Sequence, residues 1–314
     1  MSKITVDIQK AAQALSENGL VGIPTETVYG LAANGLVQSA VQKIFKAKER
    51  PSFDPLILHS TKSKIFQWAK EVPAKAKLLA DEFWPGPLTL VLPKSDVVPF
   101  ETTSGLDTVG LRVPNHPLTL ELLDLLEFPL AAPSANPFGY ISPTSAQHVV
   151  QQLGDRVDYV LDGGLCKVGI ESTIVGFENG RAVIYRLGGL TQEMIEDVIG
   201  TVMVQTNLSS NPKASGMLSV HYAPKKPLFL VTDYSDVQDD SATAYMLFGE
   251  RLNVSRERQF FLSEEGNFYE AASKLYALMR KLDDSKYNRI VVKKLPEESL
   301  GSAINDRLVR ASVK

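Results

Sequence analysis

A chain of 314 residues is long enough for two domains of about 150 residues each, and its 44% hydrophobic content is typical of a globular protein with a sizeable core. The net charge of −3 excludes an overall basic surface that would hold the whole molecule on nucleic acid, so any polyanion site must be a local group of Lys and Arg. The single cysteine, Cys166, excludes an internal disulfide and a zinc site built from several cysteines, and it fits a reducing compartment.

The N-terminus has no apolar signal-peptide core, and no window approaches the ~18 uninterrupted apolar residues that a membrane span needs. We therefore expect a cytoplasmic protein that has no membrane contact.

Apolar periodicity predicts alternating helices and strands over the first part of the chain. Helices are expected at 6–18, 39–48, 117–126, 144–153 and 191–199, with further helical patterns up to Phe83. Strands are expected at 20–24, 56–59, 88–92, 108–113, 130–132, 159–161, 172–177 and 182–185. This mixture predicts an α/β (α+β) domain with one central sheet over residues 1–200.

Residues 201–226 are rich in Ser, Asn, Pro and Gly, which predicts a linker. Beyond the linker, strands are expected at 228–231, 244–248 and 289–292, and helices at 268–282 and 300–311. These elements predict a second, smaller α/β domain over residues 227–314.

The sequence contains no P-loop, no kinase signature set and no Rossmann glycine fingerprint. A nucleotide would therefore be bound by residues from several loops. Ligands of α/β sheets lie beside the ends of strands. The candidate segments are polar, contain Gly or Pro and follow apolar strands: 24–30, 46–52, 111–114, 132–136 and 169–173.

Each candidate also has an ordinary structural explanation. Lys48 and Arg50 stand where cations commonly compensate a helix dipole, and Ser134 and Asn136 are common turn formers. Arg112 interrupts an apolar strand, and a buried arginine needs an anionic partner. A ligand carboxylate or phosphate and a structural ion pair are equally good partners for it. Polar residues at strand ends are likewise often structural: His59, Ser172, Thr173 and Arg186.

As an ordered set, the segments resemble the YrdC-type threonylcarbamoyl-AMP synthase family. The resemblance rests on Pro24-Thr25-Glu26-Thr27-Val28-Tyr29-Gly30-Leu31, Lys48-x-Arg50-Pro51, Trp84-Pro85-Gly86-Pro87-Leu88-Thr89, Arg112-Val113-Pro114, Ala132-Pro133-Ser134-Ala135-Asn136 and Glu171-Ser172-Thr173-Ile174. Gly216-Met217 and His221-Tyr222-Ala223-Pro224 are similar to the linker of the family's two-domain branch.

The resemblance implies that ATP, L-threonine and bicarbonate are converted to threonylcarbamoyl-AMP and pyrophosphate. Other proteins would then transfer the threonylcarbamoyl group to the adenosine beside the anticodon of tRNA, so that any contact of this chain with tRNA is weak or indirect. The implied fold is a twisted mixed sheet that encloses a basic cavity, followed by a small Rossmann-like domain. Mg²⁺ would accompany the triphosphate, without ligands from protein side chains.

The resemblance also implies roles for individual residues. The L-threonine site would comprise Thr25, His59, Arg112, Ala132 and Ser172. The ATP site would comprise Lys48, Ser52, Thr108, Ser134, Ser142, Arg186 and His221. The catalytic group would be Lys48, Arg50, Ser134 and Asn136. The planar guanidinium of Arg112 suits both oxygens of an amino-acid carboxylate.

The linker departs from the family at two positions. Ser215 stands where proline is usual, and Ser219 stands where some members carry an aromatic residue that contacts ATP. Three alternatives remain: an RNA-binding translation or ribosome-maturation factor, a carbamoyl transferase of hydrogenase maturation, and a regulatory binding module. The net charge and the absence of a Lys/Arg stripe disfavour the first. The second would need a zinc-binding module that one cysteine excludes.

Overall fold

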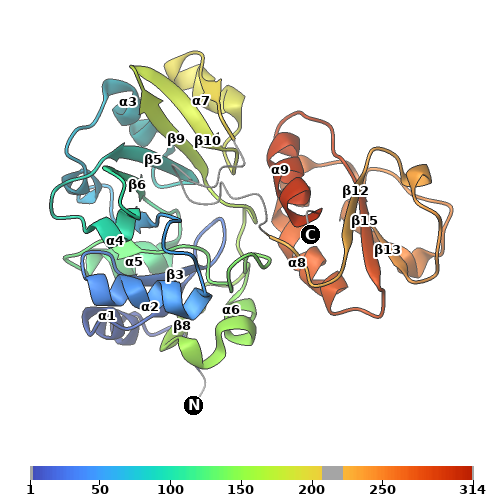
Figure 1. Ribbon diagram of the computed structural model, residues 1–314, viewed down its shortest axis with the longest axis horizontal. Coiled ribbons are helices and arrows are strands. Elements are labelled where there is room, and N and C mark those ends of the chain that lie inside the picture. The colour runs from blue at the N-terminus through green and yellow to red at the C-terminus, as the bar shows by residue number, and fades with distance from the viewer. Residues whose placement is uncertain (1–2, 207–221, 313–314) are drawn as a thin grey trace.

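The computed structural model describes residues 3–206 and 222–312. They form a large body and a small body that lie side by side (Figure 1). Within the described residues, no helix is both long and apolar enough to cross a membrane.

The large body is built on an 11-stranded sheet in the order β1-β8-β2-β3-β7-β4-β6-β5-β9-β10-β11, with parallel and antiparallel neighbours. Its strands are β1 (Ile4–Thr5), β2 (Val21–Ile23), β3 (Gly30–Asn34), β4 (Ile57–His59), β5 (Leu88–Pro93), β6 (Thr108–Arg112), β7 (Leu130–Ala131), β8 (Tyr159–Leu161), β9 (Thr173–Glu178), β10 (Arg181–Arg186) and β11 (Met203–Val204). The predicted mixed sheet is confirmed.

Helices pack beside this sheet and bury their apolar residues. They are α1 (Ile8–Ser16), α2 (Gln38–Lys48), α3 (Ala74–Phe83), α4 (Phe100–Thr103), α5 (Pro117–Asp124), α6 (Ala146–Leu153) and α7 (Gln192–Ile199). The Asp7 side chain caps α1 by accepting the Lys10 N–H at 3.1 Å, and the helix buries Ala11 and Leu15. Short 3₁₀ turns cover Ile65–Trp68 and Gly154–Arg156.

Strand β6 illustrates how the sheet separates core from cavity. Val109 and Leu111 lie in the main hydrophobic core. Because successive side chains of a strand point to opposite faces, Thr108 and Arg112 lie on the other face. In β6 the apolar side chains therefore lie in the core on one face of the sheet, and the polar side chains lie on the opposite face.

Three strands of the large sheet were not expected from the sequence: the two-residue β1, β3 and β11. Strand β3 is buried along its whole length between β2 and β7, so it lacks the alternation that identifies a strand with one solvent face. Strand β11 lies in the segment predicted as a linker, and it pairs with β10 through Met203 and Val204, although both side chains are exposed. The large sheet thus extends past residue 200.

The small body has a four-stranded, fully parallel sheet in the order β12-β15-β13-β14. Its elements are β12 (Leu228–Val231), β13 (Thr243–Phe248), β14 (Gln259–Ser263), α8 (Phe268–Asp283), β15 (Arg289–Lys293) and α9 (Gly301–Ser312), with 3₁₀ turns at Tyr234–Asp236 and Arg256–Arg258. This arrangement confirms the predicted smaller α/β domain, to which the structure adds β14.

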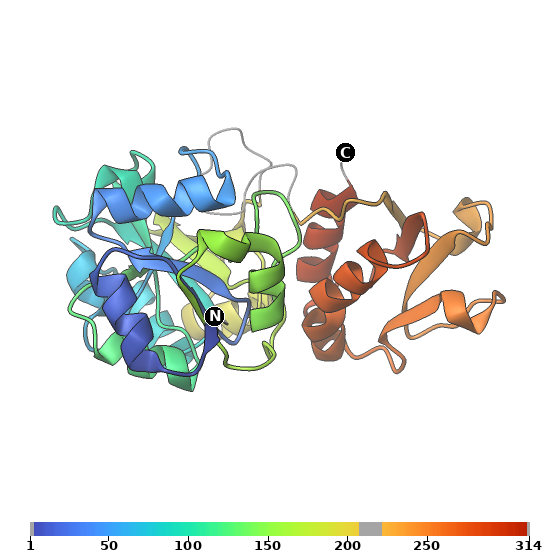
Figure 2. The same cartoon turned by 90° about the horizontal axis from the view of Figure 1, so that it is seen from below.

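Helices α8 and α9 lie between the two sheets and face the large body (Figure 2). Val28, Ile141 and Ile170 of the large body share one apolar cluster with residues of α8 such as Tyr276 and Met279. The two bodies are thus joined by a common core as well as by the chain between them.

Gly169 lies directly against the main chain of α8. Its φ is +77°, and a Cβ at this position would lie 2.5 Å from the main-chain oxygen of Ala272. Gly180 has a similar φ of +75°, but a Cβ there would meet no atom within 4 Å. A comparison of Gly169 with Gly180 therefore separates the cost of a positive φ from the cost of disturbing the contact between the two bodies.

An alanine in the left-handed backbone conformation costs about 1–2 kcal/mol. We expect Gly169→Ala to lower the free energy of unfolding by clearly more than this amount. Gly180→Ala should cost only that amount, because its Cβ enters open space. Chemical denaturation of both variants measures the difference. Equal losses would contradict the close packing of the large body against α8.

Candidate functional site

A small cavity lies at the edge of the large sheet where β4, β6 and β10 end and β9 begins. Its volume is about 40 Å³. The lining residues are Thr25, Val28, Gly30, Arg50, Ile57, His59, Arg112, Ala132, Pro133, Ser134, Glu171, Ser172, Arg186 and Tyr222. The structure therefore brings together all residues predicted for the threonine site, with Arg50, Ser134 and Arg186 beside them.

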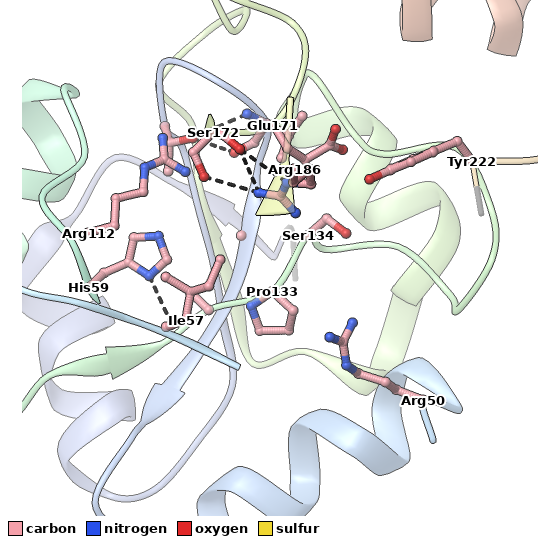
Figure 3. A pocket seen from close by; sticks show the side chains of 14 residues that line it. Arg50, Ile57, His59, Arg112, Pro133, Ser134, Glu171, Ser172, Arg186 and Tyr222 are labelled. Carbon is pink, nitrogen blue, oxygen red and sulfur yellow. Dashed lines mark hydrogen bonds between the residues drawn. The ribbon is translucent and has the colours of Figure 1, made fainter. Parts of the chain in front are cut away.

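Arg112 is buried at the end of β6, where Figure 3 shows it beside His59. Its Nη2 lies 2.9 Å from Oε1 of Glu26 and donates to Oγ1 of Thr27 at 2.8 Å. Its Nε is buried and has no hydrogen-bond partner among the described residues. Arg112 thus makes the structural ion pair that the sequence left open, and the same residue lines the cavity.

The hydroxyl of Thr25 organises the turn after β2. Its Oγ1 donates to the carbonyl oxygen of Val28 at 2.6 Å and accepts the N–H groups of Thr27 and Val28, each at 3.2 Å. These bonds fix the polar turn that carries Glu26, the partner of Arg112.

Arg186 holds the opposite wall of the cavity. Its Nε and Nη2 donate to the carbonyl oxygen of Ser172 at 3.1 and 3.0 Å, and Nη2 also donates to Oγ of Ser172 at 3.1 Å (Figure 3). Oγ of Ser172 lies 2.8 Å from Oγ1 of Thr89. The serine hydroxyl is therefore fixed next to a buried cation.

Lys48 and Asn136 are buried behind the cavity wall. Lys48 Nζ donates to the carbonyl oxygens of Ser134 and Asn136, both at 2.5 Å, and the residue is 1% exposed. Asn136 Nδ2 donates to the carbonyl oxygens of Pro137 and Tyr140, both at 2.8 Å. Burial, followed by the charge of Arg50, lowers the pKa of Lys48 well below its ordinary value. In this arrangement both side chains shape the loop that presents Ser134, and their contact with phosphate stays a prediction.

Arg50 follows the helix α2 and reaches the cavity. Its Nη2 lies 2.8 Å from Oδ2 of Asp54, and its Nε and Nη2 donate to the carbonyl oxygens of Asp54 and Pro55 at 3.1 and 3.2 Å. A loop that surrounds the guanidinium therefore fixes this cation beside the cavity.

Three of the remaining predicted ATP residues, Ser52, Thr108 and Ser142, do not line the cavity. Ser52 is exposed on the loop after α2. Ser142 is buried and donates to Oε1 of Glu171 at 2.7 Å. Thr108 lines a separate cavity of about 700 Å³, and it lies four residue steps along β6 from Arg112, a distance of about 13 Å. His221, Ser215 and Ser219 lie outside the described residues.

Sequence reasoning assigned no role to Glu171, which lines the cavity at 6% exposure. Its carboxylate accepts from Ser142, from the Tyr276 hydroxyl and from Nε of Arg307 at 3.1 Å. Burial acts to raise the pKa of Glu171, but Arg307 and Arg186 outweigh it, so that the pKa lies below its ordinary value. A glutamate directly before a buried serine is a sequence signal for such a group, but its partners are distant in the chain.

Tyr222 closes the cavity on the side of the small body (Figure 3). It is 1% exposed, stacks on Tyr276 with ring centroids 5.6 Å apart, and lies against Arg307. A residue of the predicted linker therefore forms part of the cavity wall.

Models of known protein families match both bodies of the chain. The family model described as Telomere recombination matches residues 13–188, and the one described as Threonylcarbamoyl-AMP synthase, C-terminal domain, matches residues 190–313. The chain is 39% identical to the threonylcarbamoyl-AMP synthase of Pyrococcus abyssi, over 97% of this chain and 94% of the relative. It is also 39% identical to that of Bacillus subtilis, over 97% and 92%.

The chain belongs to the threonylcarbamoyl-AMP synthase family. The resemblance noted in the sequence and the predicted enzyme class are thereby confirmed. The structure is similar to that of Pyrococcus abyssi Sua5 complexed with L-threonine, with a TM-score of 0.90 and 38% identity over 97% of this chain and 94% of that chain. The match of the small body to the family's C-terminal domain disfavours the hydrogenase-maturation alternative.

His59 lines the cavity as a neutral imidazole. Its Nδ1 lies 3.2 Å from the carbonyl oxygen of Ile57, and burial, followed by the charge of Arg112, lowers its pKa to about 3. An unfolded histidine has a pKa of about 6.5. Below that pH the unfolded chain binds a proton that the folded protein excludes.

We expect His59 to contribute stability that is fully present above about pH 6.5 and is lost by up to about 1.4 kcal/mol per pH unit between pH 6.5 and 3. In NMR spectra, the ring resonances assigned to His59 by comparison with His59→Gln should not shift between pH 8 and 5. The variant should also flatten the decline in stability over the acidic range. A titration of His59 near pH 6.5 would contradict this assignment.

Proposed function

We propose that the chain makes threonylcarbamoyl-AMP and pyrophosphate from L-threonine, bicarbonate and ATP. One observation carries the proposal: the residues expected to bind threonine line a single buried cavity, which Arg50 and Arg186 also line. Two anionic reactants must meet in this reaction, and fixed cations reduce their repulsion while they hold them in line.

Arg112 is the proposed partner of the threonine carboxylate. It lines the cavity, its Nε has no hydrogen-bond partner among the described residues, and Glu26 and Thr27 already hold the guanidinium in place. Ser172 would bind a second polar group of the amino acid. The apolar side chains of Val28 and Ile57 also line the cavity and are candidates to contact the threonine methyl group. One methyl group gives a preference over serine of only about 1–3 kcal/mol.

Arg50, Arg186 and Ser134 are the proposed contacts of the ATP phosphates. The amine of threonine and bicarbonate condense to a carbamate with loss of water. An oxygen of the carbamate then attacks the α-phosphorus, and the bond from the α-phosphorus to the leaving pyrophosphate oxygen breaks. Because charge moves onto the pyrophosphate, a guanidinium held in place by neighbouring carbonyl oxygens stabilises it without reorganisation.

Mg²⁺ is proposed to enter with the triphosphate. Glu171 lines the cavity, Glu26 contacts the lining residue Arg112, and each of these carboxylates is paired with an arginine. The donor set therefore fits phosphate oxygens as the principal ligands, with the protein holding the phosphates. The metal would neutralise phosphate charge there.

ATP needs more space than the cavity offers in this structure. We propose that Tyr222 moves away when substrates enter and returns to exclude water. Transfer of the product to tRNA would fall to other proteins in the cytoplasm, since the net charge of −3 does not favour tight binding of RNA by this chain.

We expect purified protein to release pyrophosphate from ATP only when L-threonine and bicarbonate are both present. A coupled pyrophosphate assay, with each substrate omitted in turn, measures this requirement. Release that does not require all three substrates would sink the proposed reaction. Retention of tRNA by the protein alone at physiological salt would favour the RNA-binding alternative.

Arg112→Ala should raise the KM for threonine by about 10²-fold, since it removes charged hydrogen bonds worth about 3 kcal/mol in total. The KM for ATP should change far less. The double variant Glu26→Gln/Arg112→Ala is the control, because it removes the carboxylate that the single variant leaves buried without its cation. Equal changes in the two KM values would disprove the role of Arg112 as the carboxylate clamp.

A further inference from the structure

We infer that the small body supplies positioning residues for the catalytic cavity: Arg307 of α9 and Tyr276 of α8 hold Glu171, and through it Ser172 and Arg186, in the cavity wall. The inference rests on the proposed function, because it assigns a role within that same site. It makes the small body a part of the active site.

Arg307 enters the large body as a fully buried cation. The side chain is 0% exposed, and its Nε lies 3.1 Å from Oε2 of Glu171. The Tyr276 hydroxyl lies 2.9 Å from Oε2 and 3.1 Å from Oε1 of the same carboxylate. Two helices of the small body thus converge on one side chain of the cavity wall.

Arg307 also connects the two strands that present the cavity's polar groups. Its Nη1 donates to the carbonyl oxygen of Leu187 at 2.5 Å, directly after Arg186. The carbonyl oxygen of Glu171 accepts the N–H of Gly189 at 3.0 Å. One guanidinium therefore fixes the start of β9 and the end of β10 relative to each other, which is the geometry that places Arg186 on Ser172.

Helix α8 holds a second loop of the cavity in the same way. Arg280 donates to the carbonyl oxygens of Ile141 and Ser142, and the Tyr140 hydroxyl lies 2.6 Å from Oδ2 of Asp283. This loop follows Asn136, and its Ser142 donates to Glu171. The small body thus restrains both segments that meet at Glu171.

Stability alone does not account for a buried ion pair at this place. Burial of two charges costs desolvation that their attraction only partly offsets, and an apolar pair of similar size is often at least as stable. What a buried pair provides is one fixed geometry. A displacement of about 1 Å at a reacting group can cost about 10²-fold in rate, so fixed geometry has a direct functional value here.

The charge of Glu171 depends on the same contacts. The carboxylate faces Arg307 of α9, Arg186 of β10, and the hydroxyls of Tyr276 and Ser142, with Tyr222 close by. Burial favours the protonated form, so the loss of Arg307 should raise the pKa of Glu171. Activity that needs the ionised carboxylate would then fall at acidic pH.

Three variants test the inference. Arg307→Met removes the cation and keeps most of the apolar volume, and Tyr276→Phe is a milder change that removes only the hydroxyl. Arg258→Met is the matched control, since Arg258 is also a buried arginine of the small body but donates to Thr243 and Asp239, away from the cavity. The measurements are hydrogen exchange of residues 171–173 and 187–189 without substrates, KM and kcat from pyrophosphate release, and their pH dependence.

We expect Arg307→Met and Tyr276→Phe to speed exchange in both segments. We also expect them to raise the KM for threonine or lower kcat, by about 10-fold to 10²-fold for the arginine variant. The acidic limb of kcat/KM should move to higher pH in Arg307→Met. Arg258→Met should lower the thermal midpoint and leave exchange, kinetics and pH profile near those of the unmodified protein.

The inference is overturned if Arg307→Met and Arg258→Met behave alike, or if Arg307→Met and Tyr276→Phe change the thermal midpoint alone. It is equally overturned if exchange in the two segments is unchanged in a folded Tyr276→Phe. Because exchange is measured without substrates, it also decides the positioning role if the unmodified protein releases no pyrophosphate. A lack of pyrophosphate release by the unmodified protein would count against the proposed reaction.

Discussion

The site depends on one physical constraint: a cation that leaves water must find a fixed partner. Burial of an unpaired charge is prohibitive, and this protein buries several guanidinium groups around one cavity. The ion pairs that resolve the problem are Arg50–Asp54, Arg112–Glu26 and Arg307–Glu171. Each pair also fixes a loop, so that the electrostatic requirement and the shape of the cavity have the same cause.

In the proposed mechanism, the pair of Arg112 and Glu26 serves both structure and ligand binding. Glu26 and Thr27 hold one end of its guanidinium, and the turn closed by Thr25 holds Glu26 in turn. In the proposed reaction, anionic substrates would therefore meet a cation that is already oriented. The cation has little solvent to lose, which is the condition under which fixed charges act most strongly on a reaction.

Strand ends could be predicted from the sequence because apolar runs stop there, and this is why His59, Arg112, Ser172 and Arg186 were found as candidates. Their roles came from the resemblance to a family and could not come from the pattern. Lys48 was found as a helix-end cation, but only the fold shows that Ser134 lies within reach of its Nζ.

Other features of the fold and of the site could not be predicted from the sequence, and the reason is physical in each case. Strand β3 is buried on both faces and has no period to detect, and β11 is defined by its pairing with β10 alone. Glu171 and Arg307 are separated by 136 positions, and nothing local to either indicates the other. Thr108 shares a sheet face with Arg112, yet only the fold shows that it lines a different cavity.

That separation of 136 positions has a consequence for synthesis of the protein. At about 5–20 residues per second on the ribosome, roughly 7 to 27 s pass between the addition of Glu171 and that of Arg307. During this interval the nascent large body carries Glu171 without Arg307 and Tyr276, the two small-body side chains that bind its carboxylate. The cavity can reach its final form only after α9 has been made and has docked, so assembly of the active site is a late event in the life of each new chain.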